Sequence, residues 1–253
     1  MIPIKTLEEI KIMQAGGQIL AEILKKVSQI IKPGLKTKEL DSFAEELIRK
    51  AGVKPAFKGY QGFPNVLCTS INEEIVHVIP SERKLKEGDI ISLDLGIFYR
   101  PSLKFSGFYL DSALTVPVGK VSPEASRLIR ITHKALKRGI RKLKPGNHLG
   151  DVSNAIQRYV ESQGFNVIRD LVGHGVGKKL HEEPAVPNFG QRRHGVILRE
   201  GMVLALEPMV SAGDWHITQA SDGYGFKTMD NSLSAHFEDS IAITKNGPLV
   251  LTK

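Results

Sequence analysis

The chain contains one phrase twice, and each copy ends in an acid. Residues Leu85–Asp94 read LKEGDIISLD and residues Leu198–Glu207 read LREGMVLALE, so a polar turn leads each time into an apolar run closed by a carboxylate. A second repeat lies upstream, where Lys-Pro-Gly occurs at residues 32–34 and again at residues 144–146. Duplication is the simplest explanation, and it predicts one domain built from two similar halves, roughly residues 1–120 and 121–253.

Two related halves would bring the repeated acids together. Halves packed about a pseudo-twofold axis place equivalent residues opposite each other, so Asp94 and Glu207 should face one another across the seam. Carboxylates held together in a partly buried place raise each other's pKa unless a cation compensates their charge. The repeat therefore predicts a metal site.

The expected elements run as two helices and then two strands, and this order occurs twice. Thr6 and Glu9 form a capping-box sequence that opens a helix ending at about Ile31, and a second helix with apolar residues at helical spacing follows it. The strand-like runs are residues 90–97, 109–118, 202–210 and 235–244. We expect an α+β fold, with an antiparallel sheet that carries helices on its outer face.

Alternation along these strands directs four acids into one cavity. The large apolar side chains of residues 91–97 share one strand face, and Asp94 lies on the opposite face. The same alternation turns Asp111 away from its apolar neighbours, and in the second half it selects Glu238 over the adjacent Asp239. With Glu207 these acids carry a charge of about −4, which favours two divalent cations over one.

Three histidines occur in segments shaped by glycine or proline. His174 lies in GHGVG, His181 begins HEEP, and His77 lies in EEIVHVIP. A single histidine is more often structural than functional, but three in such segments indicate a working site. Because glycines let the backbone approach a ligand closely, His174 is the natural fifth metal ligand.

Composition is typical of a globular protein, with 41% apolar and 25% charged residues. The N-terminus lacks the apolar stretch of a signal peptide, and no later run is long enough to span a bilayer. The single cysteine, Cys68, has no partner for an internal disulfide. We expect a cytoplasmic monomer without membrane contact.

Positive charge is concentrated on one predicted helix. The chain has a formal charge of +8, and a basic stripe accompanies an apolar one between Arg127 and Lys144. The stripe consists of Arg127, Arg130, Lys134, Lys137, Arg141 and Lys144. A solvated helix face is the simpler interpretation, and docking on RNA or another acidic surface is the alternative.

Five phrases together resemble a known family. They are GFPN (62–65), INEEIVH (71–77), GHGVGKKLHEEP (173–184), LEPMV (206–210) and SLSAHFE (232–238), in order along nearly the whole chain. In this combination they are similar to type 1 methionine aminopeptidase, a metallopeptidase of the pita-bread fold. The resemblance implies a single catalytic domain of two αα-ββ halves that removes the N-terminal methionine from nascent proteins and peptides.

The resemblance also implies residue roles. The five metal ligands of the family fall on Asp94, Asp111, His174, Glu207 and Glu238, the residues that the repeat, the alternation and the glycines indicate. His77 and His181 match two histidines that contact substrate and serve catalysis with Glu207. The methionine pocket falls near Phe57, Tyr60, Phe63, Cys68, Leu180 and Tyr224. One departure is the enlarged hairpin loop of residues 98–108, which separates Asp94 from Asp111 by more than is usual.

The implied cofactor is a pair of divalent metal ions. Oxygen ligands with one imidazole suit Co, Mn, Fe or Zn alike. A water shared by the ions would lose its proton near neutral pH and attack the first peptide carbonyl, with Glu207 as general base. His181 would stabilise the oxyanion and His77 would orient the scissile amide.

Two other functions are consistent with the same residues. A proline dipeptidase or an aminopeptidase P would share the fold and the five ligands, although such relatives generally carry a further N-terminal domain. A non-catalytic RNA- or ribosome-associated protein of this fold would use the basic helix Arg127–Lys144, which is also the candidate ribosome contact of an active enzyme.

Overall fold

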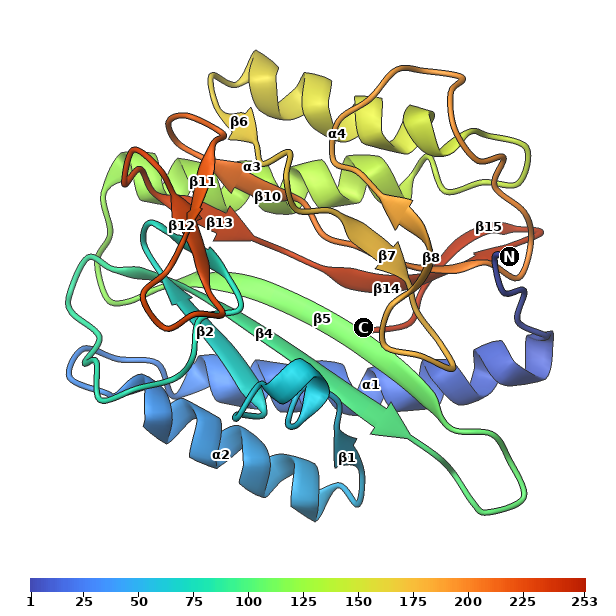
Figure 1. The fold of residues 1–253 in the computed structure, drawn as a ribbon, viewed down its shortest axis with the longest axis horizontal. Coiled ribbons are helices and arrows are strands. Elements are labelled where there is room, and N and C mark those ends of the chain that lie inside the picture. The colour runs from blue at the N-terminus through green and yellow to red at the C-terminus, as the bar shows by residue number, and fades with distance from the viewer.

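The computed structural model describes residues 1–253, and each half contains two helices followed by strands (Figure 1). The first half contains α1 (Leu7–Gln29), α2 (Thr37–Lys50), β1 (Lys54–Pro55), the 3₁₀ turn η1 (Tyr60–Gly62), β2 (Leu67–Ile71), β3 (Glu74–Val76), β4 (Ile90–Tyr99) and β5 (Phe108–Pro117). The second half contains α3 (Pro123–Ile140), α4 (Leu149–Ser162), β6 (Asn166–Val167), β7 (Gly173–Gly175), β8 (Glu182–Val186), β9 (Val203–Leu206), β10 (Met209–Ser211), β11 (Ile217–Gln219), β12 (Phe226–Thr228), β13 (Ser234–His236), β14 (Asp239–Thr244) and β15 (Gly247–Val250).

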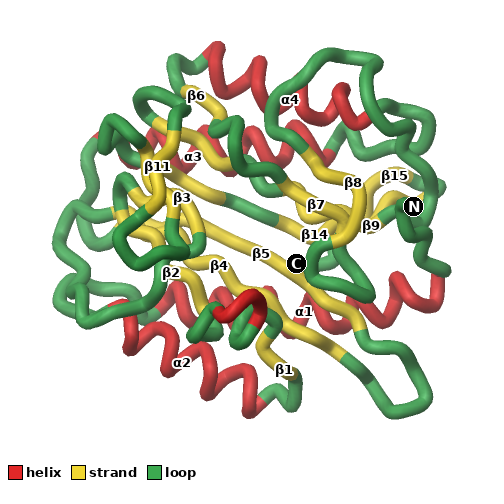
Figure 2. Tube along the Cα trace, in the orientation of Figure 1, coloured by secondary structure: helices red, strands yellow, loops and turns green.

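The arrangement of these elements confirms the predicted fold class. Figures 1 and 2 show α1 and α2 along one side of the molecule and α3 and α4 along the other, with the strands between them. Helix α1 contacts β4 and β5, and α3 contacts β9, β10 and β13. All strand pairings are antiparallel. The fold is therefore α+β, with helices covering antiparallel sheets.

Helix α1 begins at the predicted capping box. The Glu9 N–H donates to Oγ1 of Thr6 at 3.2 Å, and the Thr6 N–H donates to the Glu9 carboxylate at 2.8 Å. The helix ends at Gln29, slightly before the expected Ile31, because the residue preceding Pro33 is disfavoured in helical conformation and frays the last turn. None of the helices combines the length and the apolar character that a membrane span requires.

The two halves share the turn that follows their first helix. The Gly34 N–H donates to the Leu85 carbonyl at 2.8 Å, and the Gly146 N–H donates to the Leu198 carbonyl at 3.0 Å. Both glycines have φ in the left-handed region, at 88° and 87°, which a residue with a side chain rarely adopts. Each Lys-Pro-Gly turn is thus held by the first residue of the repeated phrase, as duplication predicts.

Strands β4 and β5 form the long hairpin expected in the first half. Their pairing runs from Ile90 opposite Pro117 to Tyr99 opposite Phe108, and it opposes Asp94 to Ala113 and Asp111 to Gly96. The enlarged loop projects beyond the sheet at the tip of this hairpin (Figure 1). The insertion therefore leaves the register of the two acids intact.

The corresponding strands of the second half are interrupted, contrary to the prediction of two continuous strands. The run 202–210 is divided into β9 and β10 at Glu207 and Pro208, and the run 235–244 is divided into β13 and β14 at Phe237 and Glu238. Pro208 has no N–H to donate to a ladder. The backbone of Glu238 pairs with Ala113 of the first half instead. Both predicted acids of this half thus lie at breaks in the sheet.

The apolar core has two parts, each built mainly from one half. The first core gathers the buried faces of α1, α2, β2, β4 and β5, including the predicted inward residues Leu93, Leu95 and Leu110. The second gathers those of α3, α4, β9, β13 and β14, including Leu204 and Ile241. The acids lie on the opposite faces of these strands, where the neighbouring side chains are smaller.

The two halves meet at a seam, where β5 runs beside the start of β14. The Glu238 N–H donates to the Ala113 carbonyl at 2.8 Å, and the Ala113 N–H donates to the Glu238 carbonyl at 3.3 Å. Next to this pair, Oγ of Ser240 accepts from the Asp111 N–H at 3.0 Å and donates to the Asp111 carbonyl at 2.8 Å. The Ser240 hydroxyl thus links the two halves next to the point where their backbones pair directly.

A second bridge of this kind provides a test of the seam. Oγ1 of Thr115 accepts from the His236 N–H and donates to the His236 carbonyl, both at 2.8 Å. Thr115→Val keeps the side-chain shape but removes the partner of both His236 backbone groups and of the Ser92 hydroxyl, which lies 2.8 Å from Oγ1 of Thr115. We therefore expect the free energy of unfolding to fall by about 2–3 kcal/mol in urea denaturation. Thr218→Val on β11 should change it by less than about 0.5 kcal/mol. Equal effects of the two substitutions would contradict a stabilising seam.

Candidate metal centre

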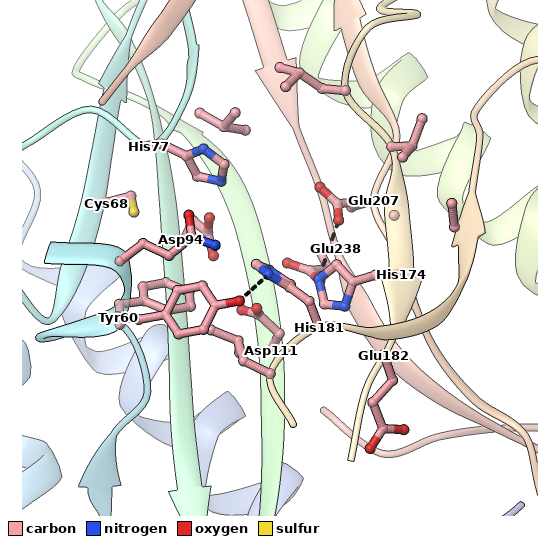
Figure 3. Close-up of a pocket in the computed structure, with 18 of the residues that line it drawn as sticks. Tyr60, Cys68, His77, Asp94, Asp111, His174, His181, Glu182, Glu207 and Glu238 are labelled. Atoms are coloured by element: carbon pink, nitrogen blue, oxygen red, sulfur yellow. Dashed lines mark hydrogen bonds and ion pairs between the residues drawn. The ribbon is translucent and has the colours of Figure 1, made fainter. Parts of the chain in front are cut away.

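A cavity of about 1130 Å³ collects side chains from both halves (Figure 3). Its walls contain every site residue selected from the sequence, namely Phe57, Tyr60, Phe63, Cys68, His77, Asp94, Asp111, His174, Leu180, His181, Glu207, Tyr224 and Glu238. Asp239 is absent from these walls, and its Oδ1 accepts a hydrogen bond from Oγ1 of Thr252 near the C-terminus. The alternation argument therefore separated the two adjacent acids correctly.

The five predicted metal ligands come from five different segments of the chain. Asp94 and Asp111 project from the continuous strands β4 and β5, and His174 is the middle residue of β7. Glu207 follows β9 directly, and Glu238 directly precedes β14. Figure 3 shows these side chains converging on one region of the cavity.

The distances within this group define a compact donor cluster. One ligand atom each from Asp111, His174 and Glu238 lies within 4.8 Å of the other two. Nε2 of His174 lies 3.6 Å from Oε1 of Glu207. Asp94 lines the same cavity, and the charges of Asp111 and Glu207 add to burial in raising the pKa of its carboxyl group, which places the remaining acid beside the cluster.

The buried acids of the cluster have strongly raised pKa values. Burial, reinforced by repulsion from the other acids, raises the pKa values of Asp94, Glu207 and Glu238 well above their ordinary range. Burial raises the pKa of Asp111 to about 7, although the Ser112 N–H donates to its carboxylate at 3.0 Å. A bound cation is what would allow all four acids to ionise together.

The donor atoms fit a divalent metal. Oδ1 of Asp94 and Oε1 of Glu238 are buried without a hydrogen-bond partner, which is costly for a carboxylate unless another ligand satisfies it. Nδ1 of His174 donates to the Gly175 carbonyl at 2.9 Å, and this bond leaves the lone pair of Nε2 directed toward the acids. Carboxylate oxygens with one neutral imidazole are a suitable ligand set for divalent transition metals.

The three predicted histidines are neutral in this environment. Burial lowers the pKa values of His77 and His174 to about 4, and the nearby His181 adds to both shifts. Burial also lowers the pKa of His181, whose Nδ1 lies 2.9 Å from the hydroxyl of Tyr60. The rings of His174 and His181 stand edge to face, with centroids 4.3 Å apart. His181 therefore lies directly beside the metal-ligand cluster.

The predicted methionine pocket is an apolar cluster beside the acids. Phe57, Phe63, Cys68 and Leu180 are buried together, and Tyr224 packs against them. The opposing strand leaves room for this cluster at Gly96, where a Cβ atom would lie 2.6 Å from the ring of Phe57. The cavity thus joins a charged wall to an apolar one.

Tyr224 is held in place by a residue that the sequence analysis did not single out. Asp222 accepts hydrogen bonds from the Ile79 N–H at 2.9 Å, the Tyr224 N–H at 3.0 Å and the Gly225 N–H at 2.7 Å. The Tyr224 hydroxyl then donates to the Gly62 carbonyl at 2.9 Å. The contacts of Asp222 with Ile79 and of Tyr224 with Gly62 join residues that are distant in the chain, so no local pattern indicates them.

His236 is a second residue that sequence reasoning missed. It is 1% exposed, its ring nitrogens have no hydrogen-bond partner, and its Nε2 lies 3.7 Å from Oε2 of Glu207. Burial lowers its pKa to about 3. The position of His236 two residues before Glu238 was a signal that could have placed it near the site.

The shifted pKa values predict how the metal-free protein responds to pH. Carboxyl groups titrate near 4 in an unfolded chain, whereas the pKa of Asp111 is raised to about 7 and those of Asp94, Glu207 and Glu238 are raised well above their ordinary range. Between the unfolded and the folded pKa values the folded state holds protons that the unfolded state has lost, so raising the pH favours unfolding. The histidines act in the opposite sense, but only below their unfolded pKa of about 6.5. Metal-free protein should therefore lose stability as the pH rises from about 6.5 to about 8.

Urea denaturation of chelator-treated protein across this range measures the effect. Asp94→Asn removes one of the four acids and should flatten the decline, and saturation with zinc should abolish it because the cation compensates the ionised acids. A metal-free protein whose stability stays constant or rises over this range would refute the electrostatic description of the site.

Comparisons with known proteins identify the family of this chain. The sequence pattern of the metallopeptidase family M24 matches residues 11–245. The methionine aminopeptidase of Clostridium perfringens is 47% identical over 252 residues, covering 100% of this chain and 99% of the relative. The crystal structure of a methionine aminopeptidase from Thermotoga maritima has a TM-score of 0.95 and 48% identity, covering 100% of both chains.

Prolidases share the fold more distantly. The prolidase of Pyrococcus horikoshii has a TM-score of 0.78 and 25% identity, and the match covers 99% of this chain but 63% of the prolidase. The chain thus corresponds to the whole of the methionine aminopeptidases and to less than two thirds of the prolidase. It belongs to the metallopeptidase family M24 and, within that family, to the methionine aminopeptidases.

Proposed function

We propose that residues 1–253 form a single catalytic domain that removes the N-terminal methionine from peptides and nascent proteins, using two divalent metal ions. The proposal rests on one observation: metal-binding side chains and an apolar pocket line opposite sides of the same cavity. Acids and an imidazole lie on one side, and the apolar cluster around Phe57, Phe63 and Leu180 lies on the other. A flexible, apolar methionine side chain suits such a pocket.

The proposal of two ions follows from charge and from the number of ligands. Asp94, Asp111, Glu207 and Glu238 would carry about four negative charges when ionised, and two divalent cations neutralise them. His174 supplies the one nitrogen ligand. Because cobalt, manganese, iron and zinc all accept this mixture of oxygen and nitrogen, the ligand set does not select one of them.

The chemistry that the ions supply when bound is to lower the pKa of water and to polarise the substrate carbonyl. Glu207 then accepts a proton from the attacking water and passes it to the nitrogen of the departing peptide. A carboxyl group that has taken up this proton can release it again, so one residue can serve first as base and then as acid.

The two remaining histidines handle the substrate. With the Tyr60 hydroxyl donating to Nδ1 of His181, the proton of that imidazole is on Nε2, which can donate to the oxyanion that develops on the carbonyl. His77 lies on the cavity wall after β3 and orients the scissile amide. Both rings are neutral near pH 7, as a hydrogen-bond partner for an amide requires.

Release of methionine from a Met-Gly tripeptide tests the proposal. Turnover should disappear on chelation and return with a divalent metal, and metal analysis of the active protein should give two ions per chain. Glu207→Gln should lower kcat by about 10²- to 10⁴-fold because the proton carrier is lost. Glu200→Gln, an exposed change in the same repeated phrase, should leave kcat unchanged.

Four results would contradict this assignment. Full activity of Glu207→Gln would move the general base elsewhere, and full activity with one ion per chain would remove the second metal. Preferential cleavage of x-Pro peptides over Met-Gly peptides would make the enzyme a proline-specific peptidase. Bound metal without any hydrolysis would favour the non-catalytic alternative.

We further propose that the exposed face of α3 contacts ribosomal RNA. The predicted apolar stripe of this helix is buried, and its basic residues Arg127, Arg130, Lys134 and Lys137 are exposed. The helix ends at Ile140, before the expected Lys144, so the exposed Arg141 and Lys144 of the predicted stripe lie in the turn that follows it. None of the six forms an ion pair with a carboxylate, whereas several lysines elsewhere on the surface do. An uncompensated basic face favours association with a polyanion.

Charge reversal separates docking from a merely solvated face. Replacing Arg130, Lys134 and Lys137 with Glu should weaken co-sedimentation with ribosomes, most strongly at low salt, and leave hydrolysis of a free tripeptide unchanged. The matched control reverses the exposed Lys11, Lys25 and Lys32 on α1 and near its end, with the same change in net charge. Equal co-sedimentation of both triple variants would leave only the solvated-face interpretation.

A further inference from the structure

An ion pair buried next to the catalytic cavity is not explained by the proposed chemistry. The side chains of Lys5 and Glu182 are 3% and 4% exposed, and the Lys5 ammonium donates to Oε2 of Glu182. Lysine and glutamate are rarely buried to this extent, and their charges must then compensate each other. Glu182 immediately follows His181 in the chain, and Figure 3 shows its carboxylate turned away from Glu207 and Glu238.

Two glycines make room for Lys5 in this position. A Cβ atom on Gly177 would lie 2.4 Å from Cε and 2.8 Å from Nζ of Lys5, so any larger residue there would displace the lysine. A Cβ atom on Gly201 would lie 2.7 Å from the Lys5 carbonyl oxygen. The Lys5 N–H also donates to the Gly201 carbonyl at 2.7 Å. The backbone of Lys5 is therefore fixed at Gly201, and its side chain passes over Gly177 to reach Glu182.

Glu182 in turn holds the loop that carries His181. Residues 177–181 form neither helix nor strand, and one hydrogen bond between their backbones, from the Gly177 N–H to the Lys179 carbonyl at 3.1 Å, joins them internally. Oε1 of Glu182 accepts from the Lys179 N–H at 3.1 Å, while Oε2 faces Lys5. One carboxylate thus connects the loop backbone to the segment that precedes α1.

We propose that the Lys5–Glu182 ion pair positions His181 for catalysis. The ammonium fixes the carboxylate, the carboxylate fixes the loop, and the loop presents the imidazole to the substrate carbonyl. At the far side of the same ring, the Tyr60 hydroxyl fixes Nδ1. Lys5 touches neither substrate nor metal in this scheme, so it acts only through His181. The inference rests on the proposed role of His181 as oxyanion donor.

Variants that remove one charge or both charges test this proposal in the metal-loaded enzyme. Lys5→Met should lower kcat by about tenfold to a hundredfold, because a misplacement of about 1 Å has an effect of that size, and should leave KM within about threefold. The double variant Lys5→Met with Glu182→Gln should show the same loss, since both lack the same connection. Lys178→Met removes an exposed lysine of the same loop and should leave kcat unchanged.

Thermal unfolding separates positioning from simple stabilisation. Lys5→Met leaves an uncompensated buried carboxylate, so its unfolding midpoint should fall, and the double variant should recover part of that loss because it buries no charge. Under the proposal kcat stays low in both variants. Recovery of kcat together with the midpoint would overturn the proposal, as would an unchanged kcat in Lys5→Met or an equal loss in Lys178→Met.

The imidazole signals of His181 supply a readout that does not depend on turnover. In zinc-loaded protein with ¹⁵N-labelled histidine, these resonances should shift in Lys5→Met and in the double variant but not in Lys178→Met. If the His181 resonances of Lys5→Met do not shift, the positioning role is refuted, even when the wild-type protein releases methionine as proposed. Conversely, a wild-type protein that releases no methionine would overturn the proposed function, and shifted resonances would still establish the control of the loop by Lys5.

Discussion

Mutual repulsion among four buried carboxyl groups is the constraint on which the rest of this structure depends. Burial and repulsion raise their pKa values, and two of their oxygen atoms have no hydrogen-bond partner in the protein. Such a cluster opposes folding unless the surrounding structure is strong enough to hold it or a cation compensates it. Two apolar cores, each built mainly from one half, support the strands that carry the acids.

The seam is therefore as important to the site as the ligands themselves. Asp111 and Glu238 lie next to each other because the backbones of Ala113 and Glu238 pair, and Ser240 satisfies the backbone of Asp111. These bonds are made by the main chain and by hydroxyl groups, so they fix the distance between two acids without adding charge. A salt bridge at the same place would instead have compensated one acid and weakened the demand for a metal.

Much of this arrangement could be predicted because the sequence marks it with patterns of fixed spacing. The repeat located the halves, alternation separated Glu238 from Asp239, and the capping box located the start of α1. The breaks in the second-half strands could not be predicted, because apolar alternation continues across Pro208 and Phe237 while the pairing partner of Glu238 belongs to the other half. The contacts of Lys5 with Glu182 and of Asp222 with Ile79 join residues far apart in the chain, so they leave no periodic trace.

The duplicated halves have diverged in one respect that bears on how the site works. Asp94 and Asp111 lie within the continuous, paired strands β4 and β5, whereas Glu207 and Glu238 lie at positions where strands end. The acids of the first half are therefore held by the pairing of their own strands. Those of the second half depend on contacts from outside their strands, as the pairing of Glu238 with Ala113 illustrates.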